Sequence, residues 1–267
     1  MSTTQRVFLT GASAGIGLAT AGALSDIGCE VWGTSRRLDR LPVNLRNFHP
    51  IELSLSEPDS ICAAWSRARS ESGGFDIVIN NAGDGWFDAL TELPLERMRA
   101  QFETLFFGPF QIIQLALPDL RERRGLLVNV TSLAVRLPIP FMAPYSAAKA
   151  ALASATAALR LELAASGVRI VDLQPGNIRT NFNEAMKPPA AGSMREAWDQ
   201  MEQDMAAAPG PEIVGAEVCR LVRSTDSPPS RVVGGFVESR LASLAARCLP
   251  ARWMERMLLR HYRQPGS

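Results

Sequence analysis

The stretch TGASAGIG, residues 10–17, decides the fold of this chain. The apolar run 6–10 leads into it, and a stretch compatible with a helix, 16–27, follows. Glycines between a strand and a helix permit a tight turn and let main-chain amides approach a pyrophosphate, towards which the helix points its partially positive N-terminus. This context predicts a dinucleotide-binding βαβ unit. The residues expected at the phosphates are Gly11, Ser13, Gly15, Ile16 and Gly17.

The rest of the chain repeats the alternation of strand and helix. Short runs rich in Val, Ile, Leu or Phe predict strands at 6–10, 30–34, 48–53, 77–80, 126–130, 169–173 and 231–233. Apolar residues at helical spacing predict helices at 16–27, 58–71, 95–120, 144–166 and 212–223. Without a linker or an internal repeat, the pattern indicates an α/β fold with a doubly wound parallel sheet of the Rossmann type, as a single domain over residues 1–267.

Composition excludes several classes of function. The 267 residues are 46% hydrophobic and carry 28 Lys and Arg against 27 Asp and Glu, a net charge of +1, so we expect no nucleic-acid partner. No stretch approaches the about 18 apolar residues that span a bilayer, and no signal peptide is recognisable, which favours a cytoplasmic protein. Four scattered cysteines and two histidines predict neither a disulfide framework nor a metal site.

The end of the second strand indicates which dinucleotide is preferred. Folds that bind NAD usually place an acid there, about 20 residues after the glycines, to bond the ribose hydroxyls. This chain has Ser35, Arg36 and Arg37 instead. Guanidinium groups attract the 2′-phosphate of NADP(H), whereas a carboxylate would repel it. We therefore expect NADP(H); the alternative is that both arginines are solvated loop charges.

Three residues form a candidate catalytic set. Tyr145 and Lys149 lie four residues apart at the start of a predicted helix and so share one face. A nearby cation favours the phenolate, which brings the tyrosine, with an ordinary pKa of about 10, into the range of acid–base work. Ser132 follows the strand 126–130, where its hydroxyl can hydrogen-bond a carbonyl oxygen on which negative charge develops.

Together these residues resemble the short-chain dehydrogenase/reductase family, over nearly the whole chain. The motifs stand in the family's order: Gly11, Gly15 and Gly17; Asn80-Asn81-Ala82-Gly83; Ser132; Tyr145 with Lys149; and Pro175-Gly176 with Thr180. Residues 34–41, 102–103 with 107–110, and 179–182 look most like the branch of 17β-hydroxysteroid and retinol dehydrogenases, which implies NADP(H) and a lipophilic (steroid-, retinoid- or polyketide-like) substrate.

The resemblance implies a role for each matching residue. Tyr145 would be the general acid in carbonyl reduction and the general base in alcohol oxidation, Lys149 would lower the pKa of Tyr145 and bond the nicotinamide ribose, and Ser132 would hold the substrate oxygen. The remaining cofactor contacts would come from Ser54, Leu55, Asn81, Ala82, Gly83, Pro175, Gly176, Ile178 and Thr180. A homodimer or homotetramer through the helices at 95–120 and 144–166 is also implied.

Two positions depart from the family pattern. Leu105 stands where the family usually has an Asn that holds a water in a proton relay to the lysine. Ser54 stands where relatives commonly carry an Asp that bonds adenine. Because leucine supplies no amide, a second hypothesis stays open, namely an NADP(H)-binding regulatory protein with little or no turnover.

Two segments remain to be interpreted. The irregular stretch 175–211 follows a late strand and is the expected substrate lid; the alternative is a structural surface loop. The tail 240–263 is a basic amphipathic helix, suited to a lid, to another subunit or to peripheral membrane contact. Six large apolar residues near the expected cleft loops could form the wall of a substrate pocket or belong to the ordinary core. They are Trp86, Phe87, Phe141, Met142, Phe182 and Met186. His49 and His261 have no evident partner and no expected chemical role.

Overall fold

The chain builds one seven-stranded parallel sheet. We describe a computed structural model over residues 4–186, 188–235 and 248–263. The strands are β1 Arg6–Leu9, β2 Glu30–Ser35, β3 Phe48–Glu52, β4 Ile77–Asn80, β5 Leu126–Val130, β6 Arg169–Pro175 and β7 Ser230–Val233. They lie in the order β3-β2-β1-β4-β5-β6-β7, all parallel to their neighbours. The predicted doubly wound Rossmann-type sheet is confirmed.

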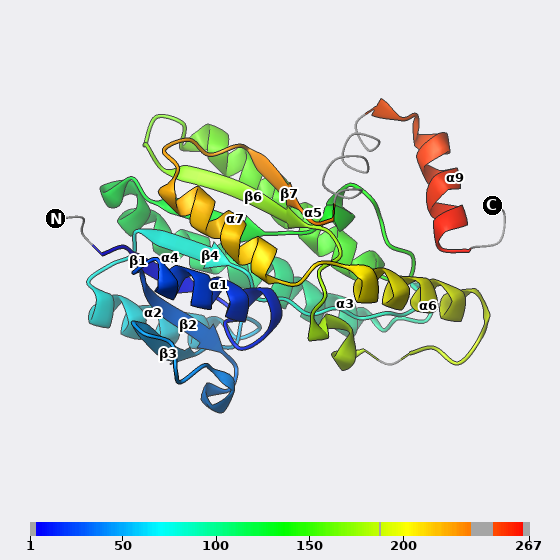
Figure 1. Cartoon of the computed structure of the whole chain (residues 1–267), viewed down its shortest axis with the longest axis horizontal. Helices are drawn as coiled ribbons and strands as arrows, with labels where there is room; N and C mark the ends of the chain where they lie inside the picture. The colour runs from blue at the N-terminus through cyan, green and yellow to red at the C-terminus, as the bar shows by residue number, and fades with distance from the viewer. Residues whose placement is uncertain (1–3, 187, 236–247, 264–267) are drawn as a thin grey trace.

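Helices cover both faces of the sheet (Figure 1). On one face lie α1 Gly15–Asp26 and α7 Glu212–Arg223, and on the other lie α2 Pro58–Ser72, α4 Gly108–Arg123 and α5 Ala143–Glu162. Each face has its own apolar cluster, because the strands are buried on both sides. The strand order reverses between β1 and β4, which is where sheets of this kind open a ligand crevice at the carboxyl ends of their strands.

The single long helix predicted at 95–120 is wrong. The structure has α3 Leu95–Phe102, a π-helical turn over Glu103–Phe107, and then α4. Pro109 has no N–H to donate to the carbonyl of Leu105, so an unbroken α-helix would lose a bond there. Gly108 also approaches the backbone of the loop after β3, where an added Cβ would lie 2.5 Å from the Leu55 oxygen. Such π turns occur frequently at functional sites.

The stretch 175–211 is more regular than the sequence predicted. A 3₁₀ turn covers Asn181–Ala185, and α6 spans Gly192–Ala207. The missed signal is the spacing of Met194, Ala197, Trp198, Met201 and Met205, which places one apolar stripe on a helix. Helix α6 uses that stripe to join a third apolar cluster, at the end of the sheet where the crevice opens.

The predicted helix in the tail is present as α9 Ala251–His261. It stands at the same end of the molecule as α6, beside the body rather than within it (Figure 1). None of its residues is fully buried. The part of the predicted tail at 240–247, with Arg240 and Arg247, lies outside the described residues.

Candidate active site

A cleft of about 640 Å³ opens at the carboxyl ends of the central strands. It gathers every residue predicted to bind cofactor or substrate, although these come from seven separate stretches of the chain. Those lining residues are Gly11, Ser13, Gly15, Ile16, Gly17, Ser35, Arg36, Arg37, Ser54, Leu55, Asn81, Ala82, Gly83, Ser132, Tyr145, Lys149, Pro175, Gly176, Ile178 and Thr180. Their common location is a structural observation; the contacts they make with a cofactor stay predictions.

The glycine loop has the geometry of a phosphate cradle. Gly11 and Gly15 adopt positive φ angles, +72° and +50°, which side chains rarely tolerate. At Gly17, a Cβ would lie 1.9 Å from the oxygen of Gly11, so no other residue fits there without movement of the loop. The main chain thereby reaches the N-terminus of α1 with no side chain between, and this open cradle fits a pyrophosphate.

Asn81 fixes this loop from the neighbouring strand. Its side-chain Nδ2 donates to the oxygens of Thr10 (3.0 Å) and Gly11 (3.2 Å). The Thr10 hydroxyl in turn accepts from the amides of Asn81 (2.9 Å) and Ala82 (3.0 Å). Asn81 therefore holds β1 and β4 together at the crevice, a structural use of its amide that the resemblance did not predict.

The two arginines after β2 differ in their surroundings. The Arg37 guanidinium pairs with Asp39, with Nε 3.0 Å from Oδ1, at the exposed surface. This pairing lowers the pKa of the Asp39 carboxyl and raises that of Arg37. Within the described part of the chain no such carboxylate partner is recorded for Arg36, which lines the cleft beside Ser35. Arg36 is thus the arginine with its charge available to a ligand.

Ser54 forms hydrogen bonds within its own loop. Its Oγ donates to Glu57 Oε1 at 3.2 Å and lies 3.1 Å from Ser56 Oγ. Because a hydroxyl accepts as well as donates, lone-pair capacity on Ser54 Oγ remains for an amino group such as that of adenine. The residue can therefore make the contact expected of an Asp there, with a weaker, uncharged acceptor.

Ser132, Tyr145 and Lys149 meet at the end of β5. Ser132 caps the short 3₁₀ turn Leu133–Val135, and its Oγ accepts from the amide of Ala134 at 3.1 Å. Lys149, on α5 one turn after Tyr145, donates from Nζ to the oxygen of Val130 at 2.8 Å. Only 4% of Lys149 is exposed, and burial lowers its pKa from 10.5 to about 8.

The phenol of Tyr145 is buried. Burial raises its pKa, while a hydrogen bond with Ser132 lowers it. The expected lowering of this pKa by Lys149 stays a prediction. In the structure Lys149 directs its Nζ to Val130, and burial disfavours its own charge. A neutral phenol is the protonation state that a proton donor requires.

A buried carboxylate near Lys149 was missed by the sequence analysis. Asp172, on β6, is 6% exposed; it accepts from the Thr131 hydroxyl, and from Gln174 Nε2 at 2.5 Å. Burial raises the pKa of Asp172, and its negative charge raises that of Lys149 in turn. The available signal was one acid inside the apolar run 170–173. Such an acid is rarely buried without a partner.

Leu105 packs against Gly83 and does not line the cleft. It is fully buried within the π turn. A Cβ added to Gly83 would lie 3.1 Å from Leu105 Cδ2 and 3.6 Å from Lys149 Nζ, so both side chains lie beside Gly83. Leucine offers no polar group there.

The other end of the cleft is apolar. Phe87, Phe141, Met142, Phe182 and Met186 all belong to the third cluster, together with Trp198 and Met201 of α6 and the ring of Tyr145. The ring centroids of Tyr145 and Phe182 are 5.7 Å apart. The cleft itself is lined there by Ile139, Met142, Phe182, Met201 and Met205. Trp86, the sixth candidate, instead lies under Arg97, whose guanidinium carbon is 4.7 Å from the ring centroid.

The histidines are also placed by the structure. His49 stacks on Trp32 with a centroid separation of 4.2 Å, away from the cleft. The expectation that His261 lacks a partner is wrong, because its Nε2 lies 2.8 Å from Asp204 Oδ2 on α6. This interaction joins residues 57 apart in sequence, a pairing that no local pattern reveals. It raises the pKa of His261.

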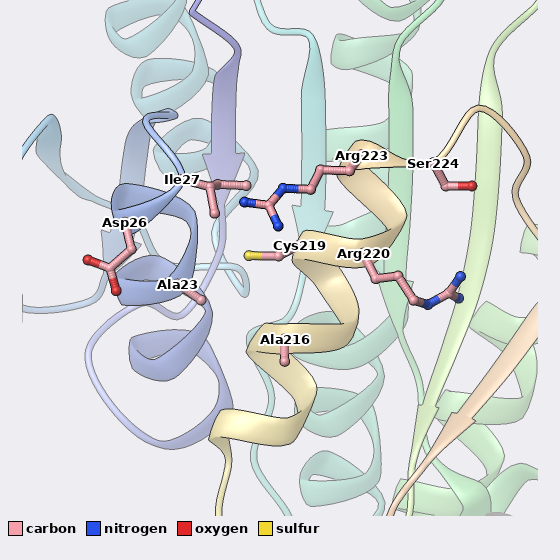
Figure 2. Close-up of a pocket in the computed structure, with 8 residues that line it drawn as sticks. All are labelled: Ala23, Asp26, Ile27, Ala216, Cys219, Arg220, Arg223 and Ser224. Atoms are coloured by element: carbon pink, nitrogen blue, oxygen red, sulfur yellow. The ribbon is translucent and has the colours of Figure 1, made fainter.

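A second hollow lies between the C-terminal halves of α1 and α7 (Figure 2). It is open and shallow, and Asp26, Arg220 and Arg223 lie around it. Helix α1 begins at the glycine loop, so this hollow is at the opposite end of the helix from the cleft, and it contains no predicted site residue. Among the residues that the structure describes, no cluster of His, Cys, Asp and Glu could hold a metal ion. None of the described helices has an apolar stretch of transmembrane length.

Comparison with known proteins assigns the class. Residues 5–190 match the family described as short chain dehydrogenase. The chain is 30% identical over 243 residues to a 3-ketodihydrosphingosine reductase of Bacteroides thetaiotaomicron, covering 88% of this chain and 89% of that protein. It is 31% identical over 210 residues to an estradiol 17-beta-dehydrogenase 2 of Rattus norvegicus, covering 75% of this chain and 53% of the rat protein.

Solved structures of similar fold support the same class of protein. A short chain dehydrogenase of Burkholderia cenocepacia in complex with NADP has a TM-score of 0.74 at 26% identity, covering 96% of this chain and 98% of that one. Other similar structures hold NADPH or NADH. The chain belongs to the short-chain dehydrogenase/reductase family and is, like its relatives, an oxidoreductase of the NAD(P)-binding Rossmann type.

Proposed function

We propose that this protein is an NADP(H)-preferring oxidoreductase that interconverts a ketone or aldehyde and the corresponding alcohol on a lipophilic small molecule. The observation that carries the proposal is the meeting, in one cleft, of Ser132, Tyr145 and Lys149 with an apolar wall that includes Met201 and Met205. Reduction adds one hydride, supplied by the nicotinamide cofactor when bound, to the carbonyl carbon and one proton to its oxygen.

The protein's own groups handle the proton and the charge. Tyr145, neutral because burial raises its pKa, donates its proton to the carbonyl oxygen. Ser132 accepts from the Ala134 amide and has one O–H, which hydrogen-bonds Tyr145; with substrate bound, this O–H would turn to the same carbonyl oxygen and stabilise the developing charge. Lys149 offers the cation that stabilises the phenolate left on Tyr145. In alcohol oxidation the same groups act in reverse.

Arg36 supports the preference for NADP(H). It lines the cleft next to Ser35, and no acid stands at the end of β2, where a carboxylate would repel a 2′-phosphate. Arg37 contributes less in this interpretation, since Asp39 already neutralises it. The Burkholderia relative that binds NADP is consistent with the preference.

Several features support a lipophilic substrate. Methionine and aromatic side chains provide the adaptable apolar surface that binds hydrocarbon portions of a ligand. Two relatives are named for long-chain or steroidal molecules, a 3-ketodihydrosphingosine reductase and an estradiol 17-beta-dehydrogenase. The lid, 175–211, would then cover the hydrocarbon part, with Thr180 lying over Gly15 of the phosphate cradle.

The deciding experiment follows oxidation of NADPH with a panel of ketones, aldehydes and quinones of increasing hydrocarbon length. We expect turnover that rises with apolar surface and a lower KM for NADPH than for NADH. Binding of NADPH with no turnover on any compound would instead favour the regulatory alternative. Leu105, which stands where the family usually has an Asn, is the observation behind that alternative, and activity gained in Leu105→Asn would identify the leucine as its cause.

A homodimer or homotetramer remains part of the proposal. Phe107, Phe110 and Leu161, on the π turn, α4 and α5, are 51%, 40% and 81% exposed. Exposed apolar side chains on the helices that the resemblance assigns to the subunit contact support this part of the proposal. Analytical ultracentrifugation of the wild type and of Phe110→Glu tests it, with dissociation of the variant as the expected result; a monomeric wild type would refute it.

A further inference from the structure

We propose that α9 is a membrane-surface helix that binds anionic phospholipid and holds the mouth of the cleft against the bilayer, so that substrate enters from the lipid. The entry of substrate from the lipid rests on the proposed lipophilic substrate. The binding of phospholipid rests on α9 alone, whose side chains form three stripes of different chemistry along the helix.

The first stripe attaches α9 to the protein. Met254, Leu258 and Tyr262 are half-buried and recur every four residues, so they share a face. Tyr262 packs on the apolar cluster at the cleft, and His261 pairs with Asp204 of α6 at 2.8 Å. These contacts turn one face of α9 to the protein, and the exposed residues of the helix lie on its outer surface.

The other two stripes lie side by side on that outer surface. Trp253 and Met257, one turn apart, are 65% and 40% exposed. Arg252, Arg256 and Arg260 follow at every fourth residue, and Arg263 extends the row, against Glu255 as the one acid in Ala251–His261. Among the described residues, none of these arginines has a carboxylate within 4.0 Å. A basic stripe beside an exposed tryptophan is the pattern of helices that lie in the plane of a membrane interface.

Charge argues for lipid over a second copy of the chain. In a two-fold symmetric dimer the same patch meets itself, which would bring one row of arginines towards another. Anionic headgroups supply the opposite charge, and each arginine near such a surface strengthens binding by about fivefold, from about 1 kcal/mol. Helix α6 beneath carries four acids, and two of them are paired, Asp199 with Arg195 and Asp204 with His261. Among the described residues, Glu196 and Glu202 remain without a cation partner, so the four arginines of the α9 row outnumber them.

The contact with α6 connects lipid binding to the active site. Asp204, which bonds α9, lies beside Met205, and both Met201 and Met205 line the cleft. A helix docked on lipid through its outer stripes therefore holds the apolar wall of the cleft about one helix diameter, about 10 Å, from the bilayer. A lipophilic carbonyl compound would then have a short path from lipid to cleft, which limits the exposure of its hydrocarbon to water.

The test is co-sedimentation of the full chain with vesicles of phosphatidylcholine alone or mixed with phosphatidylglycerol, in low and high salt. We expect binding that requires phosphatidylglycerol, weakens with salt and falls about 25-fold in Arg256→Gln/Arg260→Gln, at about fivefold per arginine. Trp253→Ala should weaken it further. The matched control, Arg67→Gln/Arg121→Gln, removes two exposed arginines from α2 and α4 and should bind as the wild type does.

Several outcomes would overturn the proposal. They are no sedimentation with phosphatidylglycerol vesicles, equal loss in the control pair, or a dimer of the wild type that Trp253→Ala dissociates. NADPH binding and thermal unfolding verify that each variant is folded. Because sedimentation needs no turnover, an enzyme that reduces lipophilic carbonyls without binding vesicles refutes the role of α9 alone, whereas binding without any turnover refutes the proposed activity alone.

Discussion

The two ends of the cleft are built in different ways. At the cofactor end, the shape of the site is determined mainly by the backbone. Gly11 and Gly15 have positive φ angles, Gly17 has no room for a Cβ, and the Asn81 amide is hydrogen-bonded to the loop. At the substrate end, side chains of the third cluster, brought from five parts of the chain, pack on one another. The cofactor end is therefore set by a few close contacts of the backbone, and the substrate end by side-chain packing that many sequences could satisfy.

The largest expected effect is at the residue where the two ends meet. Tyr145→Phe removes the proton donor while keeping the ring that packs near Phe182. We expect turnover to fall about 10²- to 10⁴-fold, the usual contribution of general acid–base catalysis, with NADPH binding retained. Stopped-flow or steady-state oxidation of NADPH measures it. Tyr262→Phe, at the only other tyrosine, is the matched control and should keep most activity; retained turnover in Tyr145→Phe would refute the catalytic assignment.

Next in size is a change confined to the cofactor end. Gly17→Ala places a Cβ 1.9 Å from the Gly11 oxygen, so the loop must move. We expect that fluorescence titration no longer detects NADPH binding. Gly22→Ala, on the same helix with open space around it, should instead raise the free energy of unfolding by about 0.5–1 kcal/mol. Similar behaviour of the two variants would contradict the view that close backbone approach builds this end.

The choice of dinucleotide comes third. Arg36→Ala should weaken NADPH binding by about 10- to 100-fold, the worth of a charged hydrogen bond, and leave NADH binding nearly unchanged. Arg37→Ala should have a smaller effect, because Asp39 already pairs with Arg37. Titration of each variant with both dinucleotides checks this. An unchanged preference in Arg36→Ala would exclude the guanidinium as its source.

The same contrast explains how much could be predicted from the sequence. The sheet, the glycine loop and the positions of Tyr145, Lys149 and Ser132 depend on local patterns that the chain displays directly. Helix α6 is not predicted, although its apolar residues have helical spacing, because the Pro and Gly residues that flank it are typical of a loop. The π turn depends on the missing N–H of Pro109 and on contact with Leu55 across the fold. The pair His261–Asp204 depends on tertiary structure alone.

A change at the substrate end should act selectively. Met205→Gln leaves a side chain of similar length but puts an amide on the apolar wall. We expect KM for a long-chain or steroidal ketone to rise about three- to tenfold, with KM for a small ketone and for NADPH unchanged, since only apolar burial is lost. Met98→Gln, on α3 and outside the cleft lining, is the control. An equal effect on small and large ketones would argue against an apolar binding site there.

The smallest effect is a shift along the pH axis. Burial lowers the pKa of Lys149 to about 8, whereas that of Tyr145 is raised above its ordinary value, so an alkaline decline of kcat/KM for NADPH near pH 8 belongs to the lysine. Between about pH 8 and 10.5 the unfolded chain binds a proton that the folded chain does not, so stability at this group rises with pH while activity falls.

Asp172 makes that shift testable. Its charge raises the pKa of Lys149, so Asp172→Asn should move the alkaline decline to lower pH, while Asp88→Asn, which removes a surface carboxylate paired with Arg97, should not move it. Both profiles come from kcat/KM for NADPH across pH 6 to 10, within the stable range found by thermal unfolding. A decline that stays in place in Asp172→Asn would show that the strand acid is structural. In that case the cofactor end would owe its chemistry to the backbone and Lys149 alone.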